Sequence, residues 1–219
     1  MAPERQRLER LAAAAGIVGP ILLAIYFGAP ALTNWPYSGA APTALIEYAR
    51  SHALLFYAGG WLQATGSLLS VLFFLALLQL SGRRNEIEGL IILLGAAVLL
   101  AIVLVEAALL EAVPIAAAAD DQATVATTFA LSNGVFARIF PLAPAPLIFA
   151  GISVALRDGR LIPAPFANAA LVIAVLFVVA GVLAIFGTAG LILAIVMSVV
   201  EAVWILAAGI AFAIRTTRR

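Results

Sequence analysis

The sequence contains no cysteine and no lysine, and His52 is its only histidine. Without cysteine the chain forms no disulfide, thiolate nucleophile, iron–sulfur cluster or thiolate zinc site. Without lysine it forms no Schiff base with retinal or pyridoxal phosphate. One histidine also excludes a bis-histidine haem and a multi-histidine metal site within one chain. We therefore expect neither a cofactor nor a metal.

Charge is also scarce, because 11% of the 219 residues are charged and 65% are hydrophobic. An ordinary soluble domain has roughly 25% charged residues. The net charge of +1 gives no field that would attract nucleic acid, so we expect no nucleic-acid partner. A chain this apolar cannot hide its surface in a core of its own. The lipid bilayer must be its solvent.

Six apolar runs are each long enough to cross a membrane as a helix, which takes about 20 residues. The first run is too long for the core of a cleaved signal peptide, so we expect it to be retained. Gly187, Thr188 and Gly190 mark a hairpin between the last two runs. The sequence predicts an all-α, polytopic transmembrane bundle that forms one domain over residues 1–219. The expected spans are residues 11–32, 53–80, 87–113, 139–156, 166–186 and 189–214.

The fourth span is the least regular. Three prolines lie at its start, namely Pro141, Pro144 and Pro146. Because proline lacks a backbone N–H and clashes with the preceding turn, we expect a kink there. Asn133 and Arg138 are polar for a helix in lipid, which predicts a separate interfacial helix over residues 123–137.

Arginine placement predicts the orientation of the bundle. With six spans, Arg50 and Arg138 fall on one side of the membrane and the remaining arginines on the other. Basic loops stay in the cytoplasm, so we expect both termini there and a multi-pass protein of the inner (plasma) membrane. Trp35 and Tyr37, after the first span, are typical of the headgroup level. The ten arginines on the predicted cytoplasmic side are Arg5, Arg7, Arg10, Arg83, Arg84, Arg157, Arg160, Arg215, Arg218 and Arg219.

Gln63 lies about ten residues into the second span, a depth of roughly 15 Å. A polar group within a span persists mainly where it faces other helices, water or a ligand. The residues that share its helical face are Gly59, Gly66, Ser67 and Ser70. This small and polar stripe is expected to face the bundle. Two interpretations stay open: a packing seam with one interhelical hydrogen bond, or a glutamine that contacts a ligand.

Glu201 lies near the middle of the sixth span, with Met197 one turn before it and Trp204 one turn after it. One helical face therefore carries a carboxyl group beside a large aromatic ring. An apolar setting favours the neutral acid, which would act as a proton donor. The alternative is a structural acid that is bonded to a neighbouring helix.

Glu106 lies in the outer half of the third span and Glu111 close to its outer end. Five residues rotate a helix by about 140°, so the two side chains do not share a face. We expect Glu106 to point inward and Glu111 to lie on the outer rim. Arg138 is a candidate salt-bridge partner for either carboxylate.

Two further polar groups lie outside the spans. His52 stands beside Glu47 and Arg50, which indicates a solvated interfacial cluster or a pH-sensitive gate. Asp120 and Asp121 are typical of a helix N-cap pair, since no further oxygen cluster lies near them in the sequence.

One stretch resembles an uncharacterised family of bacterial membrane proteins, catalogued as a domain of unknown function. The residues that carry the resemblance are Leu147, Ile148, Phe149, Ala150, Gly151, Leu156, Gly159, Leu161, Ile162 and Pro163. Ala164 departs from the family pattern, which has Arg after the proline. The resemblance implies a bundle of about six helices over most of the chain, and it supplies no catalytic residues.

No phosphate-binding loop, dinucleotide fingerprint or zinc-protease motif occurs in the sequence. Three functions stay open. The first is an enzyme that cyclises or isomerises a small hydrophobic substrate, isoprenoid or lipid-like, by acid catalysis inside the bundle. The second is a proton-coupled transporter of small molecules, and the third is a non-catalytic membrane subunit or scaffold.

For the enzyme, we expect Glu201 or Glu106 to be the catalytic acid. Trp204 and Trp61 are the expected aromatic walls, because aromatic faces stabilise a cation. The remaining predicted substrate contacts are Gln63, Arg138 and Glu111. For the transporter, Glu106 and Glu201 would be coupling sites in the last helix of each three-helix half. The expected partners are membrane lipids and the small hydrophobic ligand.

Overall fold

The computed structural model describes residues 2–36, 39–186 and 188–217. Throughout these ranges the regular elements are helices, and no strand occurs among them. Six helical segments are long and apolar enough to cross a membrane. The predicted all-α transmembrane bundle with about six spans is therefore confirmed. Four residues used in the sequence predictions lie outside the described residues, namely Tyr37, Gly187, Arg218 and Arg219.

Five of the crossings are single helices, which keep all backbone hydrogen bonds within one segment, as lipid requires. They are α1 (Ala2–Leu32), α3 (Ala53–Ser81), α4 (Ile87–Ala118), α8 (Ala164–Leu183) and α9 (Thr188–Thr217). A short helix, α2 (Pro42–Ser51), lies between α1 and α3, and a turn of 3₁₀ helix, η2 (Ala184–Phe186), follows α8. Gly82 closes α3 with a φ of 77°, in the left-handed region that suits glycine.

The fourth crossing is composite and spans Gln122–Ala155. It consists of α5 (Gln122–Gly134), the π-helical turn η1 (Val135–Ile139), α6 (Phe140–Leu142) and α7 (Pro144–Ala155). The helix expected over residues 123–137 corresponds to α5 and the start of η1, which continue into α6 and α7; its position at the membrane interface stays a prediction. The irregular stretch lies at Pro141 and Pro144, whose missing N–H groups break the regular bonding pattern.

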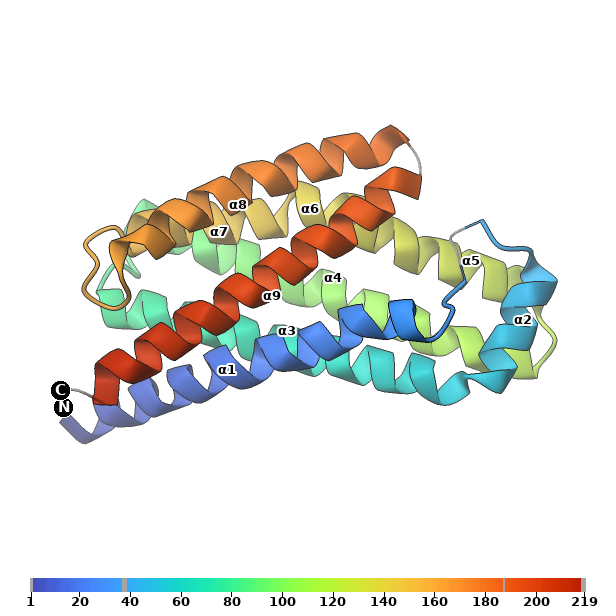
Figure 1. The fold of residues 1–219 in the computed structure, drawn as a ribbon, viewed down its shortest axis with the longest axis horizontal. Helices are drawn as coiled ribbons and strands as arrows, with labels where there is room; N and C mark the ends of the chain where they lie inside the picture. Colours follow the sequence, from blue (N-terminus) through green and yellow to red (C-terminus); the bar gives the residue numbers. More distant parts are fainter. Residues whose placement is uncertain (1, 37–38, 187, 218–219) are drawn as a thin grey trace.

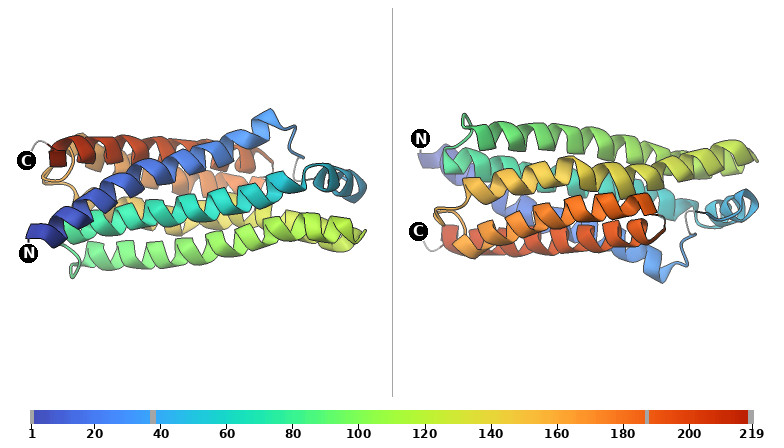
Figure 2. Two further views of the ribbon diagram at one scale, coloured as in Figure 1. Left: turned by 90° about the horizontal axis from the view of Figure 1, so that it is seen from below. Right: turned by 90° about the horizontal axis from the view of Figure 1, so that it is seen from above.

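The bundle has two unlike ends (Figures 1 and 2). Both chain termini and the α3–α4 and α7–α8 connections lie at one end, which we call the terminal end. From there α8 runs for 20 residues, about 30 Å, which matches the hydrocarbon core of a bilayer. At the other end α3, α4 and α5 continue past the α8–α9 hairpin and carry α2 (Figure 1). We call α2, α5 and these ends of α3 and α4 the distal extension.

Each part has its own core. In the main bundle Phe73, Phe74 and Phe149 are completely buried among apolar side chains of α1, α4, α8 and α9. In the distal extension Phe56 and Phe129 pack with apolar residues of α2 and α4. The site described below lies between these two cores.

The distal extension is tied together by Arg50 of α2. Its Nε donates a hydrogen bond of 2.8 Å to the Ala117 carbonyl at the end of α4, and its guanidinium pairs with Asp120 at 2.5 Å. The cluster expected around His52 is therefore only partly formed, because Arg50 turns away toward α4. His52 stacks on Tyr48 with ring centroids 4.3 Å apart. Of the predicted N-cap pair, only Asp121 caps α5.

The first and last spans pack closely through glycine. A Cβ atom on Gly209 of α9 would lie 2.3 Å from the carbonyl oxygen of Gly16 on α1. Such a gap admits no side chain, so the two backbones touch directly at this point. This contact holds α9, and with it Glu201, against α1.

Candidate functional site

Three polar side chains from three helices converge on one cavity of about 30 Å³, which we call the inner cavity. They are Gln63 of α3, Glu106 of α4 and Glu201 of α9. Ser67 and Ser70, one and two turns along α3 from Gln63, complete its polar lining. Side chains that are far apart in the sequence and that lipid would disfavour therefore meet in one place.

The three groups are buried and poorly paired. Their exposed fractions are 3% for Gln63, 3% for Glu106 and 6% for Glu201. In the described part of the chain no arginine pairs with either carboxyl group. The Gln63 amide is close enough to Glu106 to interact with it, yet the Gln63 Oε1 atom has no hydrogen-bond partner. An unpaired buried polar atom is costly, so this arrangement calls for a function.

The stripe on α3 has two roles. Gly66 faces α1, where a Cβ atom would lie 3.0 Å from the Gly19 carbonyl oxygen, so this part is a packing seam. The Ser70 hydroxyl donates a hydrogen bond of 2.8 Å to the Gly66 carbonyl. Gln63 lies one turn further along the same face and lines the inner cavity instead. Gly66 therefore belongs to a packing seam and Gln63 lines a cavity, while a contact between Gln63 and a ligand stays a prediction.

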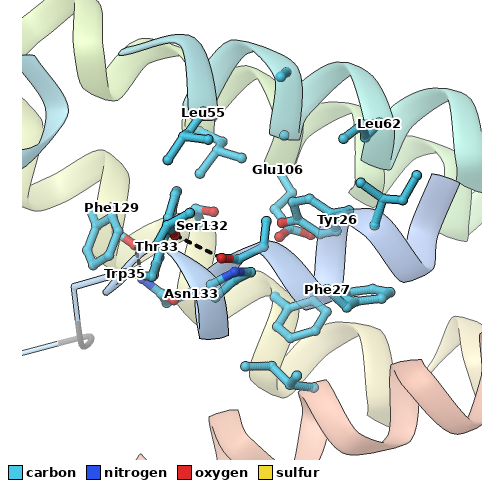
Figure 3. Close-up of a pocket in the computed structure, with 18 residues that line it drawn as sticks. Tyr26, Phe27, Thr33, Trp35, Leu55, Leu62, Glu106, Phe129, Ser132 and Asn133 are labelled. Atoms are coloured by element: carbon cyan, nitrogen blue, oxygen red, sulfur yellow. Dashed lines mark hydrogen bonds between the residues drawn. The ribbon is translucent and has the colours of Figure 1, made fainter. Parts of the chain in front are cut away.

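A larger pocket of about 230 Å³, the distal pocket, lies between the two cores (Figure 3). Its walls come from α1, α3, α4, α5 and η1, with Ile195 of α9. The aromatic wall consists of Tyr26, Phe27, Trp35, Phe129 and Phe136, and the polar lining consists of Thr33, Glu106, Ser132 and Asn133. The Glu106 carboxyl group lies beside the Tyr26 ring (Figure 3).

Two of these polar side chains are already engaged. The Thr33 hydroxyl donates to the Ala29 carbonyl at 2.8 Å, and the Asn133 amide donates to the Phe129 carbonyl at 2.8 Å. Glu106 has no such backbone bond, and its carboxyl group is the one acidic side chain in the described wall of the pocket.

Glu106 belongs to both cavities, and so do Phe27 and Phe136. These three side chains form the wall that the distal pocket and the inner cavity share. A molecule in the distal pocket would therefore contact Glu106, which also lines the inner cavity with Gln63 and Glu201.

The site lies far along the bundle from its terminal end. Glu106 follows the start of α4 by 19 residues, and Gln63 precedes the end of α3 by 18. At 1.5 Å per residue both are roughly 28 Å from the terminal end, close to the full thickness of the hydrocarbon core. Glu201 is 16 residues from the end of α9, roughly 24 Å by the same measure.

The tryptophans expected as aromatic walls lie elsewhere. Trp61 is 59% exposed on the outside of α3 and lines neither cavity. Trp204 packs against Phe74 and Phe149 in the main core, and its indole N–H donates to the Phe166 carbonyl at 3.2 Å. Sequence reasoning missed the actual aromatic wall, in which Trp35 of the segment after α1 is the one tryptophan. The position of Trp35 after the first span, typical of the headgroup level, was the one signal in the sequence that could have pointed to it.

Arg138 and Glu111 also lie outside both cavities. Arg138 is exposed on η1, where Phe136 and Ala137 turn inward instead. No ion pair joins it to Glu106 or Glu111, so the expected salt bridge is not formed. Glu111 is half-buried against α3, where its Oε1 atom would be 2.7 Å from a Cβ atom on Gly60.

The inner cavity offers few side chains that could act as metal ligands. Among the described residues no three histidine, cysteine or acidic side chains gather in a way that would hold a metal ion.

Comparisons with protein-family models, with curated proteins and with solved structures found no match for this chain. The resemblance to an uncharacterised family of bacterial membrane proteins therefore stays a prediction, and the site must be interpreted from its own geometry.

Proposed function

We propose that this protein binds a small hydrophobic, lipid-like molecule in the distal pocket, with the polar end of the molecule against Glu106. One observation carries the proposal: an apolar pocket with an aromatic wall ends at a buried carboxyl group that has no cationic partner among the described residues. Pockets that bind small molecules have this character, with apolar walls and a few placed polar groups.

The position of the pocket supports entry from the membrane. Ile25 lines the pocket and is also 54% exposed on the outside of α1. The wall therefore reaches the lipid-facing surface, and a ligand dissolved in the bilayer would enter sideways. The pocket lies at the depth where an amphiphile has its polar end, near the distal face.

The arginines support an inner-membrane protein with the terminal end in the cytoplasm. The α3–α4 connection carries Arg83 and Arg84, and the α7–α8 connection carries Arg157 and Arg160, all at the terminal end. Positively charged connections favour the cytoplasm. In this orientation the distal pocket draws its ligand from the outer leaflet.

Acid catalysis is the reaction that best suits the pocket. The Glu106 carboxyl group would donate a proton to an alkene, and the rings of Phe27 and Phe136 beside it would stabilise the resulting cation. Loss of a proton back to the carboxylate would complete an isomerisation. Incubation with an isoprenoid in deuterated buffer tests this step. Deuterium in recovered isoprenoid with the wild type, but not with Glu106→Gln, supports it, and no deuterium with either contradicts it.

A proton-coupled carrier is the second candidate, and one observation favours it. Glu106 on the third span and Glu201 on the sixth line the same inner cavity. Two carboxyl groups in the last helix of each half are what alternating-access coupling would use. Proton-driven uptake of a bound amphiphile into liposomes would support it, and uptake unchanged in Glu201→Gln would contradict it.

Fluorescence of Trp35 tests binding itself. Trp35 lines the pocket, whereas Trp61 faces lipid and Trp204 lies in the main core. A bromoalkyl alcohol is added to the protein in lipid nanodiscs. Quenching of Trp35 should saturate as the alcohol concentration rises, whereas quenching of Trp61 should be weak and increase linearly. The saturable part should vanish in Trp35→Phe. Linear quenching that is equal in both proteins would contradict the proposal.

A further inference from the structure

Few hydrogen-bond donors line the inner cavity once its two carboxyl groups are ionised. An ionised carboxyl group is an acceptor only, the amide oxygen of Gln63 is an acceptor too, and the Gln63 NH2 group, which does donate, faces Glu106. The Ser70 hydroxyl proton is already given to the Gly66 carbonyl. Among the described residues, no arginine or histidine lines the inner cavity. Ser67 is therefore the one side chain of the lining with a hydroxyl proton left to donate.

The missing donors are shown most clearly by Gln63. Its Oε1 atom is buried and unpaired, while the residue lines the cavity and its amide faces Glu106. A buried oxygen without a partner destabilises the fold, and a ligand N–H would supply the missing hydrogen bond. The observation is independent of the two carboxyl groups, and it calls for the same kind of ligand.

The size of the inner cavity limits the group that can enter it. About 30 Å³ is room for one or two water molecules. A primary ammonium group is of this size and carries three N–H donors and a positive charge. A trimethylammonium group is several times larger and has no N–H, and a hydroxyl group offers one donor without charge.

Because the two cavities share a wall, one molecule could place its ammonium group at the inner cavity and its hydrocarbon tail in the distal pocket. Phe27 and Phe136 line both cavities together with Glu106, and aromatic faces attract cations. The remainder of the distal pocket is apolar and suits a hydrocarbon chain. The inner cavity thus suits the ammonium head, and the adjacent distal pocket suits the hydrocarbon tail.

We propose that the ligand is a primary amine with a hydrophobic tail, bound as its ammonium ion, with its N–H groups on Glu106 and Gln63 and its tail in the distal pocket. Glu201 is the second carboxylate that faces the ammonium group across the inner cavity. This inference rests on the proposed function and names the chemical class of its ligand.

Competition among three amphiphiles with equal tails tests the inference. The full chain in phosphatidylcholine nanodiscs is loaded with the bromoalkyl alcohol, and Trp35 fluorescence reports its displacement. Dodecylamine should displace the probe at an at least about tenfold lower mole fraction than dodecanol, because bonds to a charged group are the stronger ones. Dodecyltrimethylammonium should not exceed dodecanol, since its head does not fit the cavity.

Variants identify the residues that cause the preference for dodecylamine over dodecanol. Glu106→Gln should bring dodecylamine to within about threefold of dodecanol, because a neutral amide cannot pair with a charge. Glu111→Gln is the matched control, since Glu111 lies on the same helix but lines neither cavity, and it should keep the tenfold preference. If Glu106→Gln does not fold, Gln63→Leu is the second variant, and it should lower the preference as well.

The outcomes separate the two proposals. Equal displacement by dodecylamine and dodecanol from the wild type overturns the ammonium inference and leaves the proposed function standing. A preference that dodecyltrimethylammonium shares also overturns it, because charge alone would then explain the effect. Displacement by none of the three contradicts the proposed function itself.

Discussion

At the scale of single residues, Glu201 distinguishes a ligand-binding site from a structural scaffold. Its carboxyl group is buried and has neither an ion pair nor a hydrogen bond in the described part of the chain. Leucine at this position would fill similar space without a polar atom. We predict that Glu201→Leu raises the free energy of unfolding by about 1–3 kcal/mol and weakens binding of dodecylamine. Thermal unfolding in detergent, with and without the amine, measures both effects.

Ser198→Ala is the control for this substitution. Ser198 is buried one turn earlier on α9, and its hydroxyl donates to the Ala194 carbonyl at 2.9 Å without lining either cavity. It should leave amine binding unchanged. A Glu201→Leu protein that is less stable than the wild type would mean that the acid holds helices together, as a scaffold requires.

Asp121 gives a prediction with a defined pH dependence. Its carboxylate accepts hydrogen bonds from the Thr124 N–H at 3.0 Å and hydroxyl at 2.5 Å, and these bonds hold the pKa of Asp121 below its usual range. A lowered pKa stabilises the fold above the unfolded value of about 3.9, and this contribution is lost as the pH falls through the folded value.

We therefore predict that Asp121→Ala loosens the first turn of α5 at pH 7, measured as faster amide hydrogen exchange over residues 122–125. The difference from the wild type should shrink as the pH falls below about 4. Asp121→Asn keeps a capping oxygen and should lose less. A difference that stays constant down to low pH would show that the carboxylate charge does not matter.

At this scale the sequence predicted the acids and missed the aromatic wall. Gln63, Glu106 and Glu201 stood out because polar groups are rare and costly within spans. Tyr26, Phe27 and Phe136 did not, because an aromatic residue in an apolar run carries no sign of which cavity it faces. Trp204 was misleading, because a ring one turn from an acid can pack into the core instead.

Among the elements, the contact between α1 and α9 is the most sensitive to side-chain size. Any Cβ on Gly209 meets the backbone of Gly16, which cannot move without shifting α1. We predict that Gly209→Ala lowers the free energy of unfolding by about 1–3 kcal/mol, the usual cost of overpacking. Thermal unfolding in detergent measures the change.

Gly28→Ala is the matched control on α1. No atom lies within 4 Å of a Cβ at Gly28, so alanine there adds helix propensity and no clash. Its stability should be unchanged or up to about 1 kcal/mol higher. Equal effects of the two substitutions would show that α1 and α9 do not touch as described.

The fourth crossing shows where pattern alone falls short for an element. The prolines and Arg138 indicated a break, and residues 123–137 were expected to lie along the interface. The structure continues the helix through η1, since a π-turn absorbs the irregularity without ending it. Whether a helix bends or ends there depends on how α4 and α8 pack against it, which no local pattern shows.

For the whole molecule, the absence of cysteine makes the orientation easy to test. Single cysteines introduced as Ser51→Cys at the distal end and Ser81→Cys at the terminal end would be the only thiols. We predict that an impermeant thiol reagent labels position 51 in intact cells and position 81 only after the membrane is opened. Labelling in the opposite order would reverse the proposed orientation.

The architecture of the whole molecule was the most predictable part, because lipid allows only long apolar helices and their number follows from the runs. The distal extension was not predictable, since α4 is one unbroken apolar helix and the polar residues of α5 indicated an interfacial helix rather than a packed one. The distal pocket depends on this extension, because its walls are formed where the ends of α1 and α3 meet α5. No local pattern encodes that meeting.

Photolabelling with an alkylamine that carries a diazirine on its tail tests the central claim most directly. Labels in the wild type should concentrate on residues 25–33 and 129–136, and an excess of unlabelled dodecylamine should remove them. An even spread over lipid-facing residues of α8, such as Val172 and Val175, without competition would contradict a specific amphiphile site at Glu106.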